Sequence, residues 1–535
     1  MSFITNLNSA DLLIIIIYIF GITWWGLRNA KNETSNDYFL AGRNMTWIVV
    51  GLSLFSASIS TSTLIGHSGS TYQYGMVIFN YNLISILVMI FFAWIFLPFY
   101  IKSGVYTMPE FLERRFDHRS KYFFSGISVF GGIFMDVSAT LYGSAMIFKI
   151  IFPEMELQVI VIIAALIVAS YTIPGGLNSV IKTEVIQAVI LIAGSVLLAV
   201  IAQHNVGSWS VLSQRFHDTV YLHLIRSATD IAIPWPALIL SLPILGFYFW
   251  GNNQQLVQRV LSAKSVDHGR KGVLLTGLLT MLTLYFIFIP AMQAAAAFPN
   301  VNPPDGIYPK MVTTWMPTIF LGIMLAVMIS ALTASLSACL NSVSTLFTMD
   351  FYRKIDKNAS SKKLVRVGQI CSSVVLIIGI FWAPQIQKFG TLINYYNEML
   401  SYVGPPIVAA FMLGLFWKRA NGTGIFAGLL STFVMALFMI FYGKEHFIQS
   451  VQNPGAPLHW LYLAPINFAF VSLVMVVVSL MTAPPPPEKV QGNVITRQFF
   501  SDEALAYKNV KFYNDFRFWA ISLFALCFVM MFIYW

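Results

Sequence analysis

The sequence predicts an all-α membrane protein with about fourteen transmembrane helices in one domain, and three observations support this prediction. The mean hydropathy is +0.72 and only 10% of the 535 residues are charged, values that do not suit a soluble domain of this length. Apolar stretches of about 20 residues, the length that crosses a bilayer as a helix, recur along the whole chain. The basic residues gather in segments that would share one side of the membrane.

The apolar stretches set the order of the elements. The first stretch is expected to remain as a helix rather than to act as a signal peptide, because Asp11 precedes it and Arg28, Lys31 and Arg43 follow it. The predicted spans lie near residues 11–28, 45–66, 76–101, 121–152, 155–174, 178–204, 233–255, 272–298, 317–348, 364–385, 391–416, 423–443, 458–482 and 516–535.

The distribution of charge predicts the orientation. With the N-terminus outside, 26 of the 32 lysines and arginines fall in inner segments, as the positive-inside rule requires. We therefore expect a multi-pass protein of the plasma (inner) membrane, with both termini on the outer side and the lipid bilayer as its surroundings. The net charge of +10 then reflects topology, so no nucleic-acid partner is expected. The sequence leaves the oligomeric state open.

Two spans carry residues that weaken a helix inside the membrane. The second holds "SASISTST" at 56–63, and the seventh holds "LPILGFYFWGNNQQ" at 242–255. Unwound backbone is tolerated in lipid only around a cavity or ligand. The two spans lie five apart and would cross in opposite directions, which is typical of inverted five-helix repeats. The repeats would cover about 45–204 and 233–416, flanked by helices 11–28, 423–443, 458–482 and 516–535. Hydroxyls bonded within the helix and glycines for close packing are the alternative.

The ninth span supplies a partner for the broken helices. It reads "AVMISALTASLSACLNSVSTLFTMD" at 326–350, with hydroxyl and small residues too dense for a lipid-facing helix. Hydroxyl and carbonyl oxygens can hold a monovalent cation without a buried charge. Close packing of small residues is the other interpretation.

Six motifs resemble the sodium:solute symporter family, and within it the sodium/sugar cotransporter branch. In order they are "DYFLAGRNM", "YTMPEFLERRF", "PGGLNSVIKTEVIQ", "NNQQLVQRVLSAKS", "LNSVSTLFTMDFY" and "GPPIVAAFMLGLFWKR", and they cover nearly the whole chain. The resemblance implies an inverted-repeat transporter fold whose repeats each begin with a discontinuous helix. It also implies sodium as the coupling ion.

The resemblance implies a set of sodium-site residues. Backbone carbonyls and two adjacent hydroxyl positions would bind the ion, and they fall on Ser56, Ile59, Ala331, Ala334 and Ser335. Ala334 departs from the family pattern because it has no hydroxyl, which leaves sodium against proton coupling open. Thr333 or Ser56 would be the residues to compensate.

An acidic residue near this site in the family corresponds to Glu184. Its carboxylate would attract the cation, or it would pair with Lys182 or Arg259.

The resemblance also implies a solute site, in which several family residues are replaced. The positions fall on Thr63, Asn82, Ser85, Gly246, Phe249, Trp250, Thr280 and Asn397. Neutral amides and hydroxyls beside an aromatic residue suit a polyhydroxylated neutral solute. Asp136 and Glu398 are ionisable groups at membrane depth, which makes them either functional candidates or partners of neighbouring helices.

The function predicted from these features is secondary active, sodium-coupled import of a small neutral solute, a sugar or polyol, by alternating access. A symporter of a carboxylate, amino acid or nucleoside is the first alternative. A channel or a non-transporting sensor of the same fold is the second. Nothing in the sequence predicts an enzyme.

Overall fold

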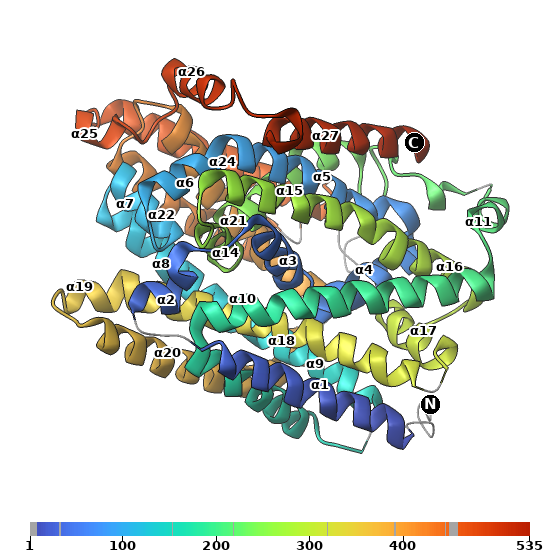
Figure 1. Ribbon diagram of the computed structural model, residues 1–535. Coiled ribbons are helices and arrows are strands. Elements are labelled where there is room, and N and C mark those ends of the chain that lie inside the picture. The colour runs from blue at the N-terminus through green and yellow to red at the C-terminus, as the bar shows by residue number, and fades with distance from the viewer. Residues whose placement is uncertain are drawn as a thin grey trace.

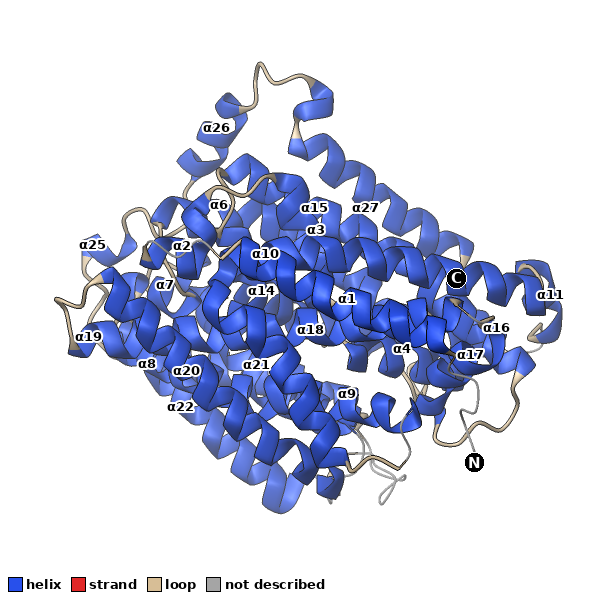
Figure 2. Cartoon of the chain, turned by 60° about the horizontal axis from the view of Figure 1, so that its bottom comes forward, coloured by secondary structure: helices blue, strands red, loops and turns tan. Residues whose placement is uncertain are grey.

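The computed structural model describes residues 8–30, 34–151, 154–217, 219–317, 319–389, 392–443, 446–448 and 458–535. These residues are almost entirely helical (Figures 1 and 2). Over this part of the chain, the only pairings of extended backbone are two isolated bridges. The predicted all-α class is confirmed.

The described residues up to 206 form ten α-helices. They are α1 (Ser9–Arg28), α2 (Ser35–Leu40), α3 (Trp47–Ser58), α4 (Thr61–Tyr74), α5 (Asn80–Phe91), α6 (Leu97–Ser103), α7 (Met108–Arg115), α8 (His118–Gly131), α9 (Ser138–Ile151) and α10 (Leu157–Val206).

The next part contains the second broken span and the most buried helix. Its helices are α11 (Trp209–Arg215), α12 (Trp235–Leu240), α13 (Leu242–Phe247), α14 (Gln254–Leu261), α15 (Val266–Thr283), α16 (Ile289–Ala297), α17 (Ile307–Trp315), α18 (Phe320–Leu346) and α19 (Arg353–Ile355). The remainder forms α20 (Ser361–Trp382), α21 (Leu392–Phe416), α22 (Gly422–Phe438), α24 (Leu463–Met481), α25 (Pro487–Val490), α26 (Arg497–Ala506) and α27 (Phe516–Ile533).

Short turns of other helix types join these elements. Six have π geometry: η3 (Phe92–Phe96), η4 (Gly132–Val137), η6 (Tyr248–Asn252), η7 (Leu284–Phe288), η9 (Phe347–Tyr352) and η11 (Met439–Gly443). The 3₁₀ turns are η1 (Ala41–Arg43), η2 (Gly75–Phe79), η5 (Val220–Leu222), η8 (Pro304–Gly306), η10 (Ala383–Phe389), η12 (Trp460–Tyr462) and η13 (Phe512–Asn514).

Eleven helices within the described ranges are long and apolar enough to cross a membrane. Some of these exceed one crossing: the stretch Leu157–Val206 has 50 residues and contains a sharp turn, and the stretch Thr63–Ser103 has 41. The broken seventh span is divided into pieces too short to be counted. The chain is therefore a multi-pass membrane protein, while the count of fourteen spans stays a prediction.

The turn within α10 depends on Gly176. Its backbone has φ 55° and ψ −163°, a conformation that only glycine adopts without strain. A Cβ atom at this position would lie 2.5 Å from the ring of Tyr38 and 2.7 Å from its carbonyl oxygen. The close approach therefore requires glycine for two independent reasons.

Helix α18 is the centre of the bundle. It is buried over nearly its whole length, whereas α1 and α27 expose apolar faces such as those of Phe20 and Phe532. It packs against α10, α1, α3 and α14, so it meets both broken spans. The hydroxyl-rich sequence predicted this burial, because such a helix would be poorly suited to face lipid.

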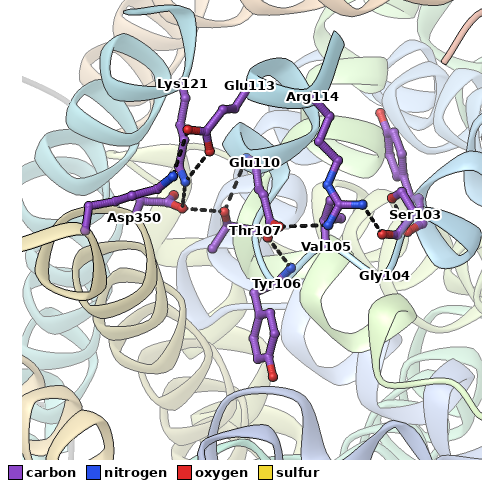
Figure 3. A network of polar contacts seen from close by, with 12 residues as sticks. Ser103, Gly104, Val105, Tyr106, Thr107, Glu110, Glu113, Arg114, Lys121 and Asp350 are labelled. Carbon is purple, nitrogen blue, oxygen red and sulfur yellow. Dashed lines mark hydrogen bonds and ion pairs between the residues drawn. The ribbon is translucent and has the colours of Figure 1, made fainter. Parts of the chain in front are cut away.

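A network of charges holds the π turn η9, which follows α18, at the end of the molecule that carries α7, α8 and α19 (Figure 1). Lys121 lies 2.9 Å from Glu113 and 3.2 Å from Asp350, and Thr107 donates to Asp350 at 2.8 Å (Figure 3). Lys354 also pairs with Glu113 at 2.9 Å. Burial opposes the charge on Glu113, but its hydrogen bonds from Lys121 and Lys354 outweigh it and lower its pKa. We call this the basic end.

At the opposite end, which holds α11, α16, α17 and both termini (Figure 1), the contacts of the described residues include neutral hydrogen bonds and the ion pair of Arg226 with Asp230 at 3.3 Å. The Tyr72 hydroxyl of α4 donates to the carbonyl of Phe298 at 2.8 Å and accepts from the N–H of Val301 at 2.9 Å. Nearby, Gly69 approaches η8 so closely that a Cβ would lie 2.9 Å from the Cα of Asp305. We call this the far end.

The first prediction concerns Gly176. Gly176→Ala should lower the free energy of unfolding by about 2–4 kcal/mol, because backbone strain adds to the clash with Tyr38. Thermal unfolding of the purified protein in detergent measures the effect. Gly492→Ala is the matched control, because Gly492 has φ 76° but nothing within 4 Å of a Cβ. Equal losses in the two variants would contradict the close-packing argument.

Candidate functional site

The two broken spans meet beside α18. In the second span, α3 ends at Ser58 and α4 begins at Thr61, leaving Ile59 and Ser60 outside both helices. In the seventh, the π turn η6 ends at Asn252 and α14 begins after Asn253. A parallel bridge between Met45 and Ala263 joins the two spans at their basic ends. The predicted breaks are thus present and lie side by side.

Side chains from the break itself cap the new helix ends. Ser60 accepts from the N–H of Thr63 at 3.0 Å and forms a capping box with it at the start of α4. Asn253 accepts from the N–H of Gln255 at 2.8 Å at the start of α14. These caps satisfy N–H groups that would otherwise be orphaned in the membrane.

Ser335 is the α18 residue that reaches the broken helix. Its hydroxyl donates to the carbonyl of Ala57 at 3.5 Å, between the expected ligands Ser56 and Ile59. Ser335, Ala331 and Ala334 are all buried. The C-terminal carbonyls of α3 carry the negative end of its helix dipole toward this point. The Ser335 hydroxyl therefore lies at the broken end of α3, beside the predicted ligands, and their role in binding sodium stays a prediction.

The missing hydroxyl at Ala334 is not replaced by Thr333. The Thr333 hydroxyl donates to the Ser330 carbonyl at 3.1 Å and accepts from Gln187 of α10 at 2.8 Å. It therefore faces α10 and not the break. The expectation that Thr333 could compensate is wrong, because its hydroxyl is already bonded on another face of α18.

Glu184 of α10 pairs with Arg259 of α14. The guanidinium contacts the two carboxylate oxygens at 3.1 and 2.5 Å, both side chains are fully buried, and Ser53 of α3 donates a further hydrogen bond. Lys182 instead donates to Asn29 at 3.1 Å. Of the two partners considered for Glu184, the structure shows Arg259. Together with the hydrogen bond from Ser53, the pair joins α10, α14 and α3 near the break.

The expected solute residues of α5, α13 and α15 come together. Asn82 donates to the hydroxyl of Thr283 at 2.8 Å, and Thr283 in turn donates to the carbonyl of Thr280 at 2.5 Å. Ser85 lies near Gly246, since its hydroxyl oxygen is 4.0 Å from where a glycine Cβ would be. This places amide, hydroxyl and bare backbone groups on three neighbouring helices.

Three further residues predicted to bind the solute, Phe249, Trp250 and Thr63, make other contacts. Phe249 and Trp250 contact each other edge to face at 5.3 Å, and the buried indole N–H of Trp250 has no partner among the described groups. Thr63 is used in the cap of α4. The side chains of Asn397 and Glu398 lie outside the described part of the structure, so their predicted roles stay predictions.

A pocket lies between the breaks and the basic end. Asp136 lines it from the π turn η4, Tyr248 from the π turn η6, and Ser342 from α18. Gln255 and Cys339 also line it, and the Cys339 thiol donates to the Gln255 amide oxygen at 3.2 Å. The Gln255 amide N–H points in turn to the Ala57 carbonyl at 3.5 Å. One amide therefore connects the pocket to the predicted ion site.

Comparison with known proteins decides the family. The model of the sodium:solute symporter family matches residues 38–431. The chain belongs to the sodium:solute symporter family. This family member is 33% identical to the sodium/myo-inositol cotransporter of Mus musculus, covering 94% of this chain and 77% of the relative. It is 32% identical to sodium/glucose cotransporter 1 of Oryctolagus cuniculus, covering 90% and 80%. These relatives are cotransporters, not enzymes.

Solved structures agree on the fold. A Na⁺-coupled sialic acid symporter in a substrate-bound outward-open state superposes with a TM-score of 0.78 at 22% identity, covering 90% of this chain and 99% of that one. Mhp1, a nucleobase-cation-symport-1 family transporter in a closed conformation, gives 0.54 at 12% identity, covering 87% and 99%. The predicted transporter fold is confirmed. The division of the chain into two inverted repeats, at about residues 45–204 and 233–416, stays a prediction.

Sequence reasoning missed several residues of the site. Thr283 fixes Asn82 although 201 positions separate them, and Gln255 links the pocket to α3. Their only signal was a polar side chain in an apolar span, which is shared by many packing residues.

The second prediction tests the buried pair. Glu184→Leu should lower the free energy of unfolding by about 3–5 kcal/mol, because it leaves the buried Arg259 without a counter-charge. The double variant Glu184→Leu/Arg259→Met should lose clearly less, since no charge then remains buried. Thermal unfolding in detergent measures both. A double variant less stable than the single would contradict this account.

Proposed function

We propose that this protein is a sodium-coupled symporter that imports a small neutral polyhydroxylated solute, a sugar or polyol. The observation that carries the proposal is the contact of Ser335 with the Ala57 carbonyl at the broken end of α3. It gathers neutral oxygens in the membrane, as a site for a monovalent cation requires. The relatives that are sodium/myo-inositol and sodium/glucose cotransporters support the ion and the solute class.

The charges near the breaks support a neutral solute. Asn82, Ser85 and Thr283 offer amide and hydroxyl groups, and Glu184 is neutralised by Arg259. The pocket below the breaks is lined by Asp136 and by no lysine or arginine among the described residues. A carboxylate solute would meet a like charge there without a cation to pair it. The alternative of an anionic solute is therefore disfavoured.

The mechanism we propose is alternating access. Sodium and solute bind at the breaks from the far end, the broken spans move against the rest, and both are released at the basic end. By the positive-inside rule the basic end is cytoplasmic, so both termini are outside and the protein lies in the plasma membrane. The two inverted repeats would be residues 45–204 and 233–416.

One sodium ion suffices energetically. A single charge moving through about 100 mV gains about 2.3 kcal/mol. A roughly tenfold sodium gradient adds about 1.4 kcal/mol. Together they sustain a solute accumulation on the order of a few hundredfold.

The third prediction tests the function. Proteoliposomes should take up labelled myo-inositol at least about tenfold faster with an inward sodium gradient than with potassium, because uptake is driven by the ion. Galactose and glucose should compete to about the same extent as each other, since a site without charged groups for particular hydroxyls discriminates little among hexoses. Uptake that does not depend on sodium would overturn the coupling. Competition by amino acids or nucleosides but not by polyols or sugars would favour the alternative solute classes.

The fourth prediction concerns the ion. Ser335→Ala should raise the sodium concentration for half-maximal uptake roughly 5-fold or more, because loss of a buried ligand costs about 1–3 kcal/mol. Ala334→Ser should lower it by restoring the family's second hydroxyl. Ser337→Ala is the control, because that hydroxyl donates to the Thr333 and Ala334 carbonyls of its own helix. An unchanged sodium dependence in Ser335→Ala would remove this residue from the ion site.

A further inference from the structure

A second cavity lies at the basic end, between α6, α7 and the segment that contains α25 and α26. Its volume is about 240 Å³, and none of its lining residues belongs to the broken spans or to the predicted solute site. Figure 1 shows α25 and α26 at the outer edge of the bundle. We call this cavity the edge cavity, and its position separates it from the proposed transport pathway.

The edge cavity is positively charged. Lys102 of α6 and Arg114 of α7 line it, and no carboxylate does so among the described residues. Arg114 pairs with Glu110 at 2.9 Å. Glu503 of α26 lies 2.6 Å from Arg270 and 3.7 Å from Lys102. These three cations share two carboxylates, so one positive charge remains, and Lys102 carries it because its contact is the longest and its side chain is 63% exposed.

The basic groups that line the edge cavity retain hydrogen-bond donors. The contacts of Arg114 with Glu110 and with the carbonyl of Ser103 use two of the five N–H donors of its guanidinium. The distance of 3.7 Å from Lys102 to its carboxylate exceeds that of a hydrogen bond. The amide of Gln491 lines the same cavity. Donors from three segments around one cavity suit an anion with several acceptor oxygens, as a phosphate group has.

The edge cavity also has apolar lining and lies at the membrane surface. The rings of Phe99 and Phe499 stack at 4.9 Å, and Phe111 lines the cavity with them. A free hydrated ion gains nothing from such rings, whereas a phosphate ester with an apolar chain does. The segment from α26 to η13 exposes Phe500 and Phe512 directly before the membrane-spanning helix α27. Exposed aromatic residues in this place are typical of a segment that rests in the bilayer interface.

We propose that the edge cavity binds the headgroup of an anionic phospholipid. The phosphodiester accepts hydrogen bonds from Lys102 and Arg114, and its single negative charge balances the unpaired positive charge of the group. Gln491 bonds to a headgroup hydroxyl, and the lipid chains leave the cavity past Phe99 and Phe499. The bound lipid joins α6 and α7 to α26, so it stabilises the contact between the bundle and the segment that leads to α27.

Native mass spectrometry of the detergent-purified protein measures the affinity for the first bound lipid. Dioleoyl phosphatidylglycerol should bind about fivefold more tightly than dioleoyl phosphatidylcholine, because the choline cation offsets the attraction of the basic residues. Inorganic phosphate should displace phosphatidylglycerol poorly, since it has no apolar part. Equal affinity for the two lipids would overturn the proposal. Displacement by inorganic phosphate at the same concentration as by the lipid would assign the cavity to free phosphate and overturn it as well.

Charge variants place the lipid in the cavity. Lys102→Gln should weaken phosphatidylglycerol binding about fivefold, and Lys102→Gln/Arg114→Gln about 20-fold, because each basic residue contributes separately. Lys357→Gln/Lys362→Gln is the matched control, since it removes two charges from exposed positions at the basic end, and it should leave the affinity unchanged. Thermal unfolding in detergent without added lipid checks that each variant folds. The single variant at the largely exposed Lys102 keeps the test decisive if the double variant does not fold. Unchanged binding in Lys102→Gln, or equal weakening in the control, would refute the site.

Discussion

In lipid, every main-chain N–H and C=O group must find a partner within the protein, and the whole arrangement follows from the two places where the helices stop doing this. At Ile59–Ser60 and at Asn253 the chain leaves its helix, and Ser60 and Asn253 cap the helices that follow. On the other side of the first break, the carbonyl of Ala57 accepts from Ser335 of the buried helix α18. The polar interior is thus a consequence of backbone interruptions as much as of side chains.

The charged side chains near the breaks are arranged in two different ways. Glu184 and Arg259 neutralise each other, and burial makes that pair a fixed brace for α10, α3 and α14. The oxygens proposed to hold the ion are then neutral ones, such as those of Ser335 and Ala57. Asp136 lines a separate small pocket between the π turns η4 and η6.

The sequence predicted the features that composition controls. The helical class follows from the hydropathy, and the gathering of charge on one side follows from the positions of the basic residues. The break within "SASISTST" follows from its weak helix formers. Each of these signals can be recognised within a short stretch of sequence. The position of Ser335 followed from the family resemblance. The choice of Arg259 over Lys182 as partner of Glu184 did not, because it depends on how α10 and α14 lie against each other. The register of a π turn and the contact of Asn82 with Thr283 are likewise set by packing between distant helices, which no local pattern records.

The two ends of the molecule close by different physical means, and this gives them different sensitivities to the surrounding solution. The basic end is joined by ion pairs, among them the partly exposed Lys354–Glu113 and Arg114–Glu110, whose attraction dissolved salt weakens. The far end has neutral contacts, such as the Tyr72 hydroxyl shared between Phe298 and Val301, beside the largely buried ion pair of Arg226 and Asp230. Dissolved salt weakens neutral hydrogen bonds and buried ion pairs much less than exposed ion pairs. A change of salt on the side of the basic end should therefore alter how readily that mouth of the carrier opens, while the other mouth is left almost as it was.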